Sequence, residues 1–362
     1  MFDIGAAFSG TYAEARGKFV AAARTRVPDV EANTHPTARG AENEALAIDA
    51  ALVGEIASAS LLVVTSGMHG VEGFAGSGCQ VALLQDDVVA NAIAHAKIAV
   101  LFVHAANPFG FSHLRRVNED NVDVNRNFRD FDSTAAPNAE YAAIHALVVP
   151  DRWPPPPEIT QAIGNYLARH GMRRLQAALT RGQAEFADGL VYAGRKPAWS
   201  NLVLRELLAR HGRERARLGW IDLHTGLGPW GHGERIYNGP DEAAAIARAR
   251  HWYGDDVTTM YDDTSSSSLL TGASFHAAIE SCPGVEFTGI TLEFGTKPQQ
   301  DVFNALRAEQ WLANHPDTDV ATRQAIKQQM RDAFFDERDV WKAMVYAQAR
   351  ATVLQAIHAL AT

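Results

Sequence analysis

Cysteine is nearly absent from this chain, which has only two in 362 residues, Cys79 and Cys282. Two cysteines in so long a chain do not make the disulfide framework of a small secreted protein. They also form no C-x-x-C pair, so they indicate neither a zinc knuckle nor a thiol redox motif. We therefore expect two free thiols in a reducing compartment, and a cytoplasmic location.

The sequence also lacks a basic surplus and a long hydrophobic run. Its 42 acidic and 33 basic residues give a formal net charge of −9, whereas a nucleic-acid partner favours a basic face. No stretch approaches the roughly 18 uncharged apolar residues of a transmembrane helix, and the N-terminal string MFDIGAAFSGTYAEARGKF lacks the regions of a signal peptide. We therefore expect neither a nucleic-acid partner nor a membrane partner, and the sequence gives no indication of the oligomeric state.

The sequence does contain short apolar runs that alternate with longer helical segments. Four runs rich in β-branched residues each lead into glycine, asparagine, serine or histidine, which is typical of strands buried on both faces. These runs are residues 61–65, 98–104, 218–223 and 289–294. Segments with helical spacing lie at residues 12–24, 139–148, 159–179, 202–211, 301–314 and 339–360. The alternation predicts an α/β layer fold with a mostly parallel or mixed sheet.

A proline-rich break interrupts this alternation at residues 149–158 (VPDRWPPPPE). Four prolines in a row fit neither a regular helix nor a central strand. The break opens a long segment that continues to the strand near residue 218. Because candidate site residues lie on both sides of it, we interpret residues 149–217 as an insertion within a single domain that spans residues 1–362.

A histidine and a glutamate directly follow the first of these strands, in the string SGMHGVEGFAGSG. His69 and Glu72 have the spacing H-x-x-E, and a tight turn can direct both side chains at one point as zinc ligands. A catalytic zinc has three protein ligands and one position left for water. His224, at the end of a later strand (WIDLHTGLG), is the best candidate for the third ligand, and His104 is its main rival.

Residues 107–128 (NPFGFSHLRRVNEDNVDVNRNF) are dense in hydrogen-bond donors. The planar guanidinium groups of Arg116 and Arg126 can hold a carboxylate or a developing oxyanion at two points. Asn125 adds an amide donor beside Arg126, and Asp123 can accept a hydrogen bond from the outer nitrogen of a metal-bound histidine. Taken alone, an arginine-rich segment is more often a solvated polar loop, so these residues are informative only together with the metal motif.

A glutamate, Glu293, stands in the last apolar strand, in the string TLEFGT. A carboxylate in such a strand is costly unless it has a role or a partner. Beside a zinc ion, a glutamate can take a proton from water and pass it to a leaving amine. Taken alone, Glu293 is equally well explained as a buried structural partner of an arginine.

In this order, the motifs resemble those of the zinc carboxypeptidases, the carboxypeptidase A-like metallopeptidases, and more narrowly an uncharacterised bacterial branch of that family. The resemblance extends over roughly residues 10 to 350 and is carried by the strings SGMHGVEGFAGS, RVNEDNVDVNRNF, YAGRKPAWSN, IDLHTGLGPWG and TLEFGT. It implies a three-layer α/β/α fold, with helices on both faces of a mixed, mostly parallel, twisted sheet of about eight strands.

The resemblance also implies a role for each residue of the metal site. His69, Glu72 and His224 match the ligands of one Zn²⁺ per chain. Glu293 matches the catalytic general base, and Asp123 matches the carboxylate that orients the first histidine ligand.

On the substrate side, Arg116 matches the arginine that polarises the scissile carbonyl and stabilises the oxyanion. Asn125 and Arg126 match the pair that binds the terminal carboxylate of the substrate. The family's peptidases also use a tyrosine on a mobile loop, and the spacing leaves that role open between Tyr253 and Tyr261.

Three functions are compatible with these motifs. The first is a zinc metallocarboxypeptidase that cleaves an amide or peptide bond next to a free carboxylate. The second is a deacylase of the aspartoacylase type, because such enzymes also hold a carboxylate while they cleave N-acyl amino acids. The substrate is therefore expected to be a peptide or an N-acyl amino acid. The third is an inactive binding protein on the same fold, although every ligand and catalytic position holds a competent residue.

Overall fold

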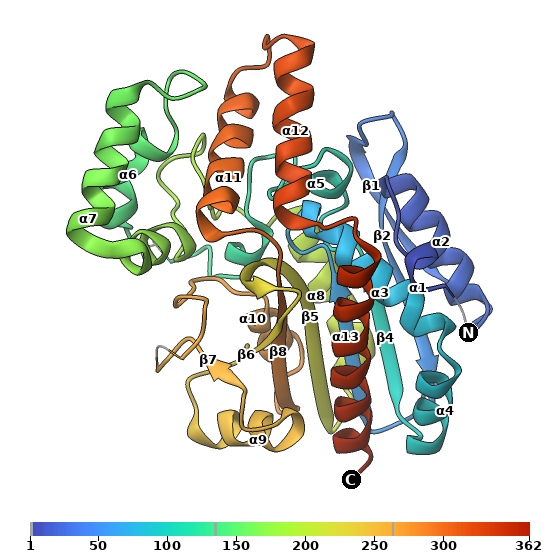
Figure 1. The fold of residues 1–362 in the computed structure, drawn as a ribbon. Coiled ribbons are helices and arrows are strands. Elements are labelled where there is room, and N and C mark those ends of the chain that lie inside the picture. The colour runs from blue at the N-terminus through green and yellow to red at the C-terminus, as the bar shows by residue number, and fades with distance from the viewer. Residues whose placement is uncertain (1–2, 134–135, 263) are drawn as a thin grey trace.

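The computed structural model describes residues 3–133, 136–262 and 264–362, which surround one sheet of eight strands (Figure 1). The strands are β1 (Glu31–Arg39), β2 (Ala45–Gly54), β3 (Ser60–Ser66), β4 (Ala99–His104), β5 (Arg217–Trp230), β6 (Gly233–Tyr237), β7 (Thr258–Thr259) and β8 (Glu286–Gly295). Their order in the sheet is β1-β2-β4-β3-β5-β8-β6-β7. The central strands β4, β3, β5 and β8 are parallel, as are β6 and β7, whereas the pairs β1–β2, β2–β4 and β6–β8 are antiparallel.

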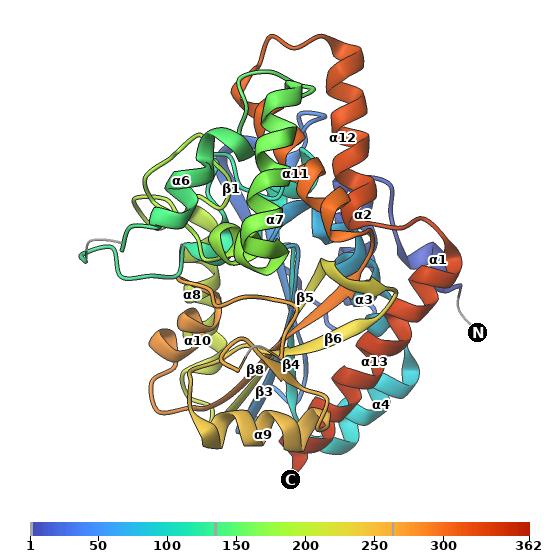
Figure 2. The same ribbon diagram turned by 60° about the vertical axis from the view of Figure 1, so that its left-hand side comes forward.

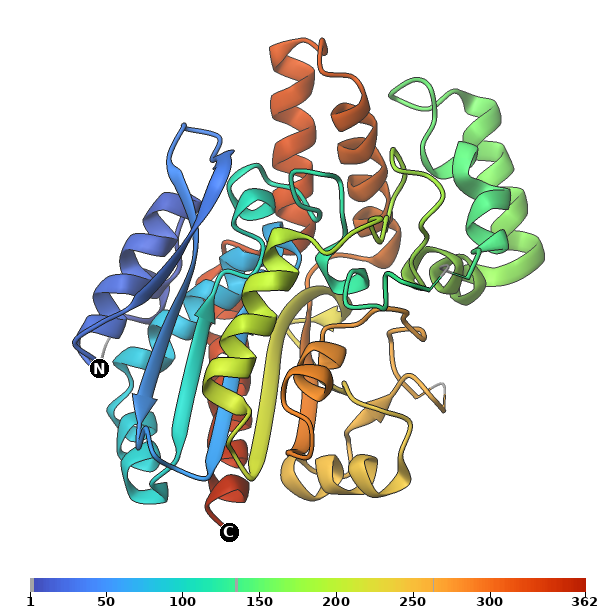
Figure 3. The same ribbon diagram turned by 180° about the vertical axis from the view of Figure 1, so that it is seen from behind.

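Helices cover both faces of this sheet. One face packs against α1 (Ile4–Ala7), α2 (Tyr12–Arg24), α3 (Gly73–Gln85), α4 (Asp87–Ala96), α9 (Ala243–Tyr253) and α13 (Asp339–Ala361). The opposite face, seen from behind in Figure 3, packs against α8 (Trp199–Gly212) and α10 (Phe275–Ser281).

The remaining helices gather at the edge where the parallel strands end (Figures 1 and 2). They are α5 (Pro108–Ser112), α6 (Ala139–Val148), α7 (Pro157–Thr180), α11 (Gln299–Asn314) and α12 (Val320–Phe334). Two short 3-10 turns, η1 (Gly70–Glu72) and η2 (Val124–Arg126), lie in loops at the same edge. Within the described ranges, no helix is both long enough and apolar enough to cross a bilayer.

The side chains of β3 alternate between two hydrophobic cores. Leu62 and Val64 belong to the core under α3 and α13, whereas Leu61 and Val63 belong to the core under α8 and α10. Successive side chains of a strand point to opposite faces, so a strand covered on both sides is apolar throughout. The predicted three-layer α/β/α fold with a mixed, mostly parallel sheet is confirmed.

The four predicted strands correspond to β3, β4, β5 and β8, and the six predicted helices to α2, α6, α7, α8, α11 and α13. The sequence prediction misses α3 because its residues 73–84 are all buried, which removes any amphipathic pattern. Its glycines permit close packing, since a Cβ at Gly78 would lie 2.2 Å from the ring of Phe8. It also misses β1, an edge strand whose side chains are mostly exposed or half-buried.

The segment that follows the proline-rich break packs in two different places. Helix α7 joins α6 in a small apolar cluster that includes Tyr141, Ile144 and Leu175. Helix α8, in contrast, packs on the sheet through Val203 and Leu207. The division of the chain into one domain with an insertion at residues 149–217 stays a prediction, because within that segment α7 packs away from the sheet and α8 packs on it.

Candidate active site

Neighbouring strands bring the candidate metal ligands to one edge of the sheet. β3 and β5 are parallel and in register, with Ser66 opposite Leu223. The turn after β3 carries His69, and the next residue of β5 after Leu223 is His224. Two histidines that are 155 residues apart in the chain therefore meet beside each other.

The turn that carries His69 and Glu72 depends on glycine. A Cβ at Gly70 would lie 2.1 Å from the backbone carbon of Gly110, so only glycine fits this close approach. The backbone N–H of Gly70 donates to the carbonyl of Arg116 at 3.1 Å. The loop that follows β4 therefore holds the turn in place from the other side.

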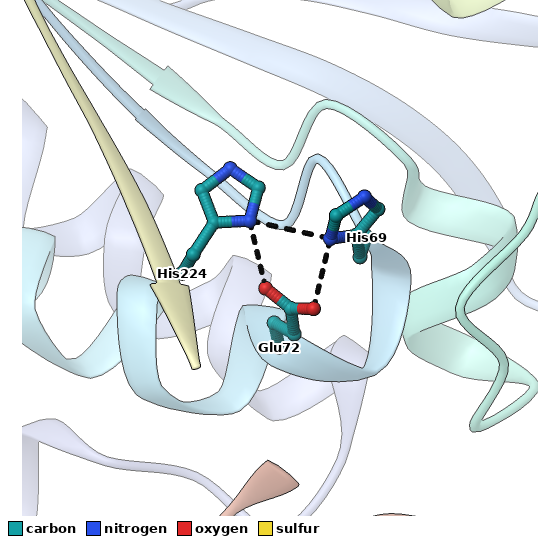
Figure 4. Close-up of side chains that lie close together, drawn as sticks. All are labelled: His69, Glu72 and His224. Carbon is teal, nitrogen blue, oxygen red and sulfur yellow. Dashed lines mark hydrogen bonds and ion pairs between the residues drawn. The ribbon is translucent and has the colours of Figure 1, made fainter. Parts of the chain in front are cut away.

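The three candidate ligands are buried and face one another (Figure 4). His69 Nδ1 lies 2.8 Å from Glu72 Oε1, and His224 Nδ1 lies 2.9 Å from Glu72 Oε2. The two Nδ1 atoms are 3.2 Å apart. Among the residues that the structure describes, this is the one group of three histidine, cysteine or acidic side chains placed to hold a metal ion.

A carboxylate lies at the outer nitrogen of each histidine. Asp222 Oδ2 is 2.8 Å from His224 Nε2, and Asp123 Oδ1 is 3.3 Å from His69 Nε2. A carboxylate oxygen accepts a hydrogen bond from a ring N–H, so it favours the tautomer that carries the proton on Nε2 and leaves the Nδ1 lone pair free for a metal. The sequence motifs identify Asp123 but not Asp222. The spacing D-x-H on a strand was the available signal, because residues i and i+2 share a face.

The net charge of the side chains around this centre is also suited to a bound metal ion. The side chains around the two histidines include four carboxylates and two guanidinium groups, those of Glu72, Asp123, Asp222, Glu293, Arg116 and Arg126. When all six are ionised and both histidines are neutral, as metal binding requires, two negative charges remain uncompensated, and a divalent cation would balance them. Burial alone would lower the pKa of His224, but Asp222 and Glu72 raise it well above its usual value. Two imidazole nitrogens and one carboxylate are also the donor set of many catalytic zinc sites.

Glu293 lies on β8 directly opposite His224 of β5. Its side chain is buried, and Oε1 accepts a hydrogen bond from the backbone N–H of Leu227 at 3.0 Å. Burial raises the pKa of Glu293 to about 8, and the nearby charge of Glu72 acts in the same direction. A cation at the triad would lower that pKa. The position thus combines closeness to the metal centre with a raised affinity for protons, as a general base requires.

Arg116 contacts the candidate ligands themselves. Its Nε donates to Asp123 Oδ2 at 2.9 Å, and its Nη1 lies 3.4 Å from Glu72 Oε1. Its Nη2 lies 2.7 Å from His69 Nε2. Nη2 can donate to that nitrogen only when the nitrogen carries no proton, whereas Asp123 requires the proton there. The two contacts to Nε2 therefore belong to opposite tautomers of His69.

Asn125 and Arg126 offer donors beside this centre. Asn125 Oδ1 accepts the backbone N–H of Ser274 at 2.9 Å, so its Nδ2 is directed away from that contact. Arg126 donates from Nε to the Thr180 carbonyl at 2.5 Å, but its nearest carboxylate oxygen, on Asp123, is 4.0 Å from Nη1. Burial lowers the pKa of Arg126 to about 10, because Asp123 compensates for it only in part. Arg126 is therefore a buried cation that an anionic ligand would stabilise.

One cavity, with about 1260 Å³ of space including its open mouth, connects these groups. Seven of the predicted residues line it: His69, Glu72, Arg116, Asn125, Arg126, His224 and Glu293. Much of its remaining wall comes from α7 and α11, through Leu175, Leu179, Val302, Phe303 and Leu306. No sequence motif marks these wall residues, because both helices have the pattern of ordinary amphipathic helices.

The open alternatives from the sequence lie elsewhere. Neither Tyr253 nor Tyr261 is among the described residues that line the cavity. Tyr253 is buried in the core at the end of α9, and the Tyr261 hydroxyl donates to the Gly239 carbonyl at 2.7 Å. His104, the rival ligand, is fully buried with Nε2 2.8 Å from Ser77 Oγ, and burial lowers its pKa to about 3. It is a neutral histidine of the core.

Comparison with known proteins shows which family the chain belongs to. The family described as proteins of unknown function (DUF2817) matches residues 8–348, and a search of curated proteins gives no match. Among solved structures, thrombin-activatable fibrinolysis inhibitor has a TM-score of 0.53 at 11% identity and covers 97% of this chain and 74% of its own.

Bovine thrombin-activatable fibrinolysis inhibitor, solved with a tick carboxypeptidase inhibitor, has a TM-score of 0.50 at 10% identity and covers 97% of each chain. Carboxypeptidase A from Helicoverpa armigera has a TM-score of 0.43 at 13% identity and covers 90% of this chain and 74% of its own. At such low identities the likeness is one of fold. The chain belongs to the DUF2817 family, and the solved structures that resemble it include a carboxypeptidase A, in agreement with the resemblance that the sequence motifs indicate.

Proposed function

We propose that this protein is a zinc-dependent hydrolase that cleaves an amide or peptide bond next to a free carboxylate. The observation that carries the proposal is the cavity, which is lined at once by a ligand triad, a carboxylate of raised pKa and two guanidinium groups. Each of these groups has a separate use in such a reaction, and a binding protein needs none of them together.

His69, Glu72 and His224 would hold one zinc ion through two Nδ1 atoms and a carboxylate oxygen. Zinc bound there would supply Lewis acidity, which makes water a stronger acid and a carbonyl a better electrophile. Asp123 and Asp222 keep the Nδ1 lone pairs available by accepting hydrogen bonds from the N–H groups of the two outer nitrogens.

Glu293 acts as the base. It accepts a proton from the water that attacks the carbonyl carbon, and it returns that proton to the nitrogen when the C–N bond breaks. The products are a carboxylic acid and an amine. The acid takes the oxygen and one hydrogen of water, and the amine takes the other hydrogen. The hydrogen bond from the Leu227 N–H keeps the carboxylate oriented beside the centre.

Arg116 donates to the oxygen that becomes negative during attack. In the metal-binding tautomer of His69, the proton on Nε2 faces Asp123, and Nη2 of Arg116 loses its acceptor there. That N–H becomes available to a substrate oxygen, while the bond from Nε to Asp123 keeps the guanidinium in place. Donors of this kind contribute roughly 3–4 kcal/mol to the transition state in comparable sites.

Asn125 and Arg126 bind the free carboxylate of the substrate. Arg126 is buried and only partly compensated by Asp123, and a planar guanidinium suits a carboxylate well. Asn125 and Arg126 together form a carboxylate clamp. This clamp can hold the C-terminal carboxylate of a peptide or the carboxylate of an N-acyl amino acid, so both substrates are included in the proposal.

The test combines metal content with hydrolysis. We expect about one zinc per chain by elemental mass spectrometry, and its loss in His69→Ala. The zinc-loaded protein should release an amine from N-acyl amino acids or dipeptides, and amidation of their carboxylate should slow the reaction at least ~100-fold. Glu293→Gln should keep the zinc and lose about 100- to 10,000-fold in kcat. Zinc-loaded wild type that cleaves neither class of substrate would contradict the proposal.

A further inference from the structure

The part of the cavity away from the metal centre is walled by two helices that contact each other. Leu175 and Leu179 of α7 and Phe303 and Leu306 of α11 all line it, and all four belong to the apolar cluster of the α6–α7 region. Figures 1 and 2 both show α7 alongside α11, above the end of the sheet. This wall therefore comes from the segment that carries the proline-rich break, and from a helix that packs against it.

Polar contacts fix this wall in position. Gln299 of α11 donates to Gln176 Oε1 of α7 at 2.8 Å, and Gln176 Nε2 donates to the carbonyl of Ser266 at 2.5 Å. The end of α7 is also tied to the carboxylate clamp, because Arg126 Nε donates to the Thr180 carbonyl. Leu179, the neighbour of Thr180, is consequently close to the place where the clamp would hold a substrate.

Among the residues that the structure describes, none that lines the cavity has an unused charge with which to recognise a charged side chain. Seven of these lining residues are ionisable, and six of the seven are the candidate metal triad, Glu293, Arg116 and Arg126. The seventh, Glu309, is buried and already paired, since Arg115 Nε and Lys327 Nζ each lie 2.8 Å from its Oε1. A second carboxylate or an ammonium group on the substrate would thus be buried without a partner.

We infer, on the basis of the proposed hydrolase function, that the substrate is an N-acylated amino acid, or the last residue of a peptide, with an uncharged, apolar side chain. The clamp holds its carboxylate, and the apolar wall of α7 and α11 holds its side chain. Burial of apolar surface against Leu179 and its neighbours favours such a group. Burial of an unpaired charge in the same place opposes an acidic or basic one.

A panel of N-acetyl derivatives of leucine, phenylalanine, aspartate and lysine tests this inference. For the zinc-loaded wild type, we expect kcat/KM for leucine and phenylalanine to exceed that for aspartate and lysine at least ~100-fold. Calorimetric titration of the same compounds into zinc-loaded Glu293→Gln measures binding without turnover and should give the same order.

Two matched leucines on α7 provide the variants. Leu179 and Leu167 are both half-buried members of the same apolar cluster, but only Leu179 lines the cavity. Leu179→Ala makes room beside the clamp for a larger side chain. It should therefore raise kcat/KM for N-acetyltryptophan relative to N-acetylleucine at least ~3-fold, which corresponds to the burial of about one additional methylene group. Leu167→Ala should leave that ratio unchanged. A gain on the larger substrate cannot arise from misfolding.

The outcomes distinguish failure of this inference about the substrate from failure of the proposed hydrolase function. Equal or better cleavage of the aspartate or lysine derivatives would overturn the inference and leave the hydrolase intact. If no compound is cleaved, the hydrolase function fails, and the binding order in Glu293→Gln still decides the chemistry of the cavity. Binding that does not distinguish charged from apolar compounds would refute the inference in either case.

Discussion

We expect the two aspartates behind the histidines to determine how tightly the candidate site binds a metal ion. Asp222 lies 2.8 Å from His224 Nε2 and also accepts the hydroxyl of Thr65 at 2.5 Å. Removing such a partner frees the imidazole to rotate and to change tautomer, which costs about 10- to 100-fold in metal affinity. We expect Asp222→Ala to weaken zinc binding by that factor, measured by competition with a fluorescent chelator.

Asp222→Asn is the matched control, because it keeps the shape of the side chain and one oxygen acceptor. Its loss of zinc affinity should be smaller than that of Asp222→Ala. Equal affinity of wild type and Asp222→Ala would mean that Asp222 serves only the buried contact with Thr65.

Glu293 makes the stability of the metal-free protein depend on pH. Its pKa is about 8 in the folded protein, above the ordinary value of 4.5. Between these values the folded protein holds a proton that the unfolded chain has released. The contribution of Glu293 to stability is therefore complete below pH 4.5 and is lost as the pH rises through 8.

Glu293→Gln removes this dependence, because glutamine keeps the acceptor for the Leu227 N–H and carries no charge. In the presence of a chelator, we expect the variant to match the wild type at pH 5. At pH 9 it should be more stable by on the order of 1–3 kcal/mol in urea unfolding. The same difference at both pH values would show that the effect is not the ionisation of Glu293.

At the scale of the element, α7 has a bend that glycine permits. Gly171 has φ 78° and ψ 162°, a region open almost only to glycine, although a Cβ there would meet no atom within 4 Å. We expect Gly171→Ala to destabilise the protein by about 1–3 kcal/mol through backbone strain alone, as measured by chemical denaturation.

Gly164 on the same helix gives the opposite expectation. It is exposed and has ordinary helical backbone angles, and a Cβ at this position would also have no neighbouring atom within 4 Å. Gly164→Ala should therefore stabilise the protein by about 0.5–1 kcal/mol. If both substitutions have the same sign, the bend at residue 171 is not a fixed feature of the helix.

At the scale of the whole molecule, the candidate metal site joins distant parts of the chain. His69 follows β3, His224 lies in the buried part of β5, and Glu293 lies beside it on β8. A ligand that binds only the folded state stabilises it by mass action, by about 4 kcal/mol at a concentration 1,000 times its Kd. Zinc should therefore raise the unfolding temperature of the wild type and not that of His69→Ala.

His95→Ala is the control for this measurement, because His95 is an exposed histidine on α4 remote from the triad. It should respond to zinc as the wild type does. If zinc raises the unfolding temperature of all three proteins equally, the ion binds elsewhere.

Much of the fold could be predicted because its signals are local. The central strands are apolar throughout, since both faces are buried, and α2 and α13 carry helical spacing. The signal fails where burial is complete or nearly absent, as in α3 and in the edge strand β1. Those elements show no regular alternation of apolar and polar residues, so their secondary structure could not be predicted from the sequence pattern.

The sequence by itself identified the side chains that meet in the cavity, because H-x-x-E, the asparagine–arginine pair and the strand glutamate are short patterns with fixed chemistry. Only the tertiary structure decided the partners of those side chains. Thr65 against Asp222, Arg116 against Glu72, and the wall of Leu179 and Phe303 all depend on how distant segments pack. Packing of that kind is determined by shape and burial in three dimensions, and no spacing along the chain encodes it.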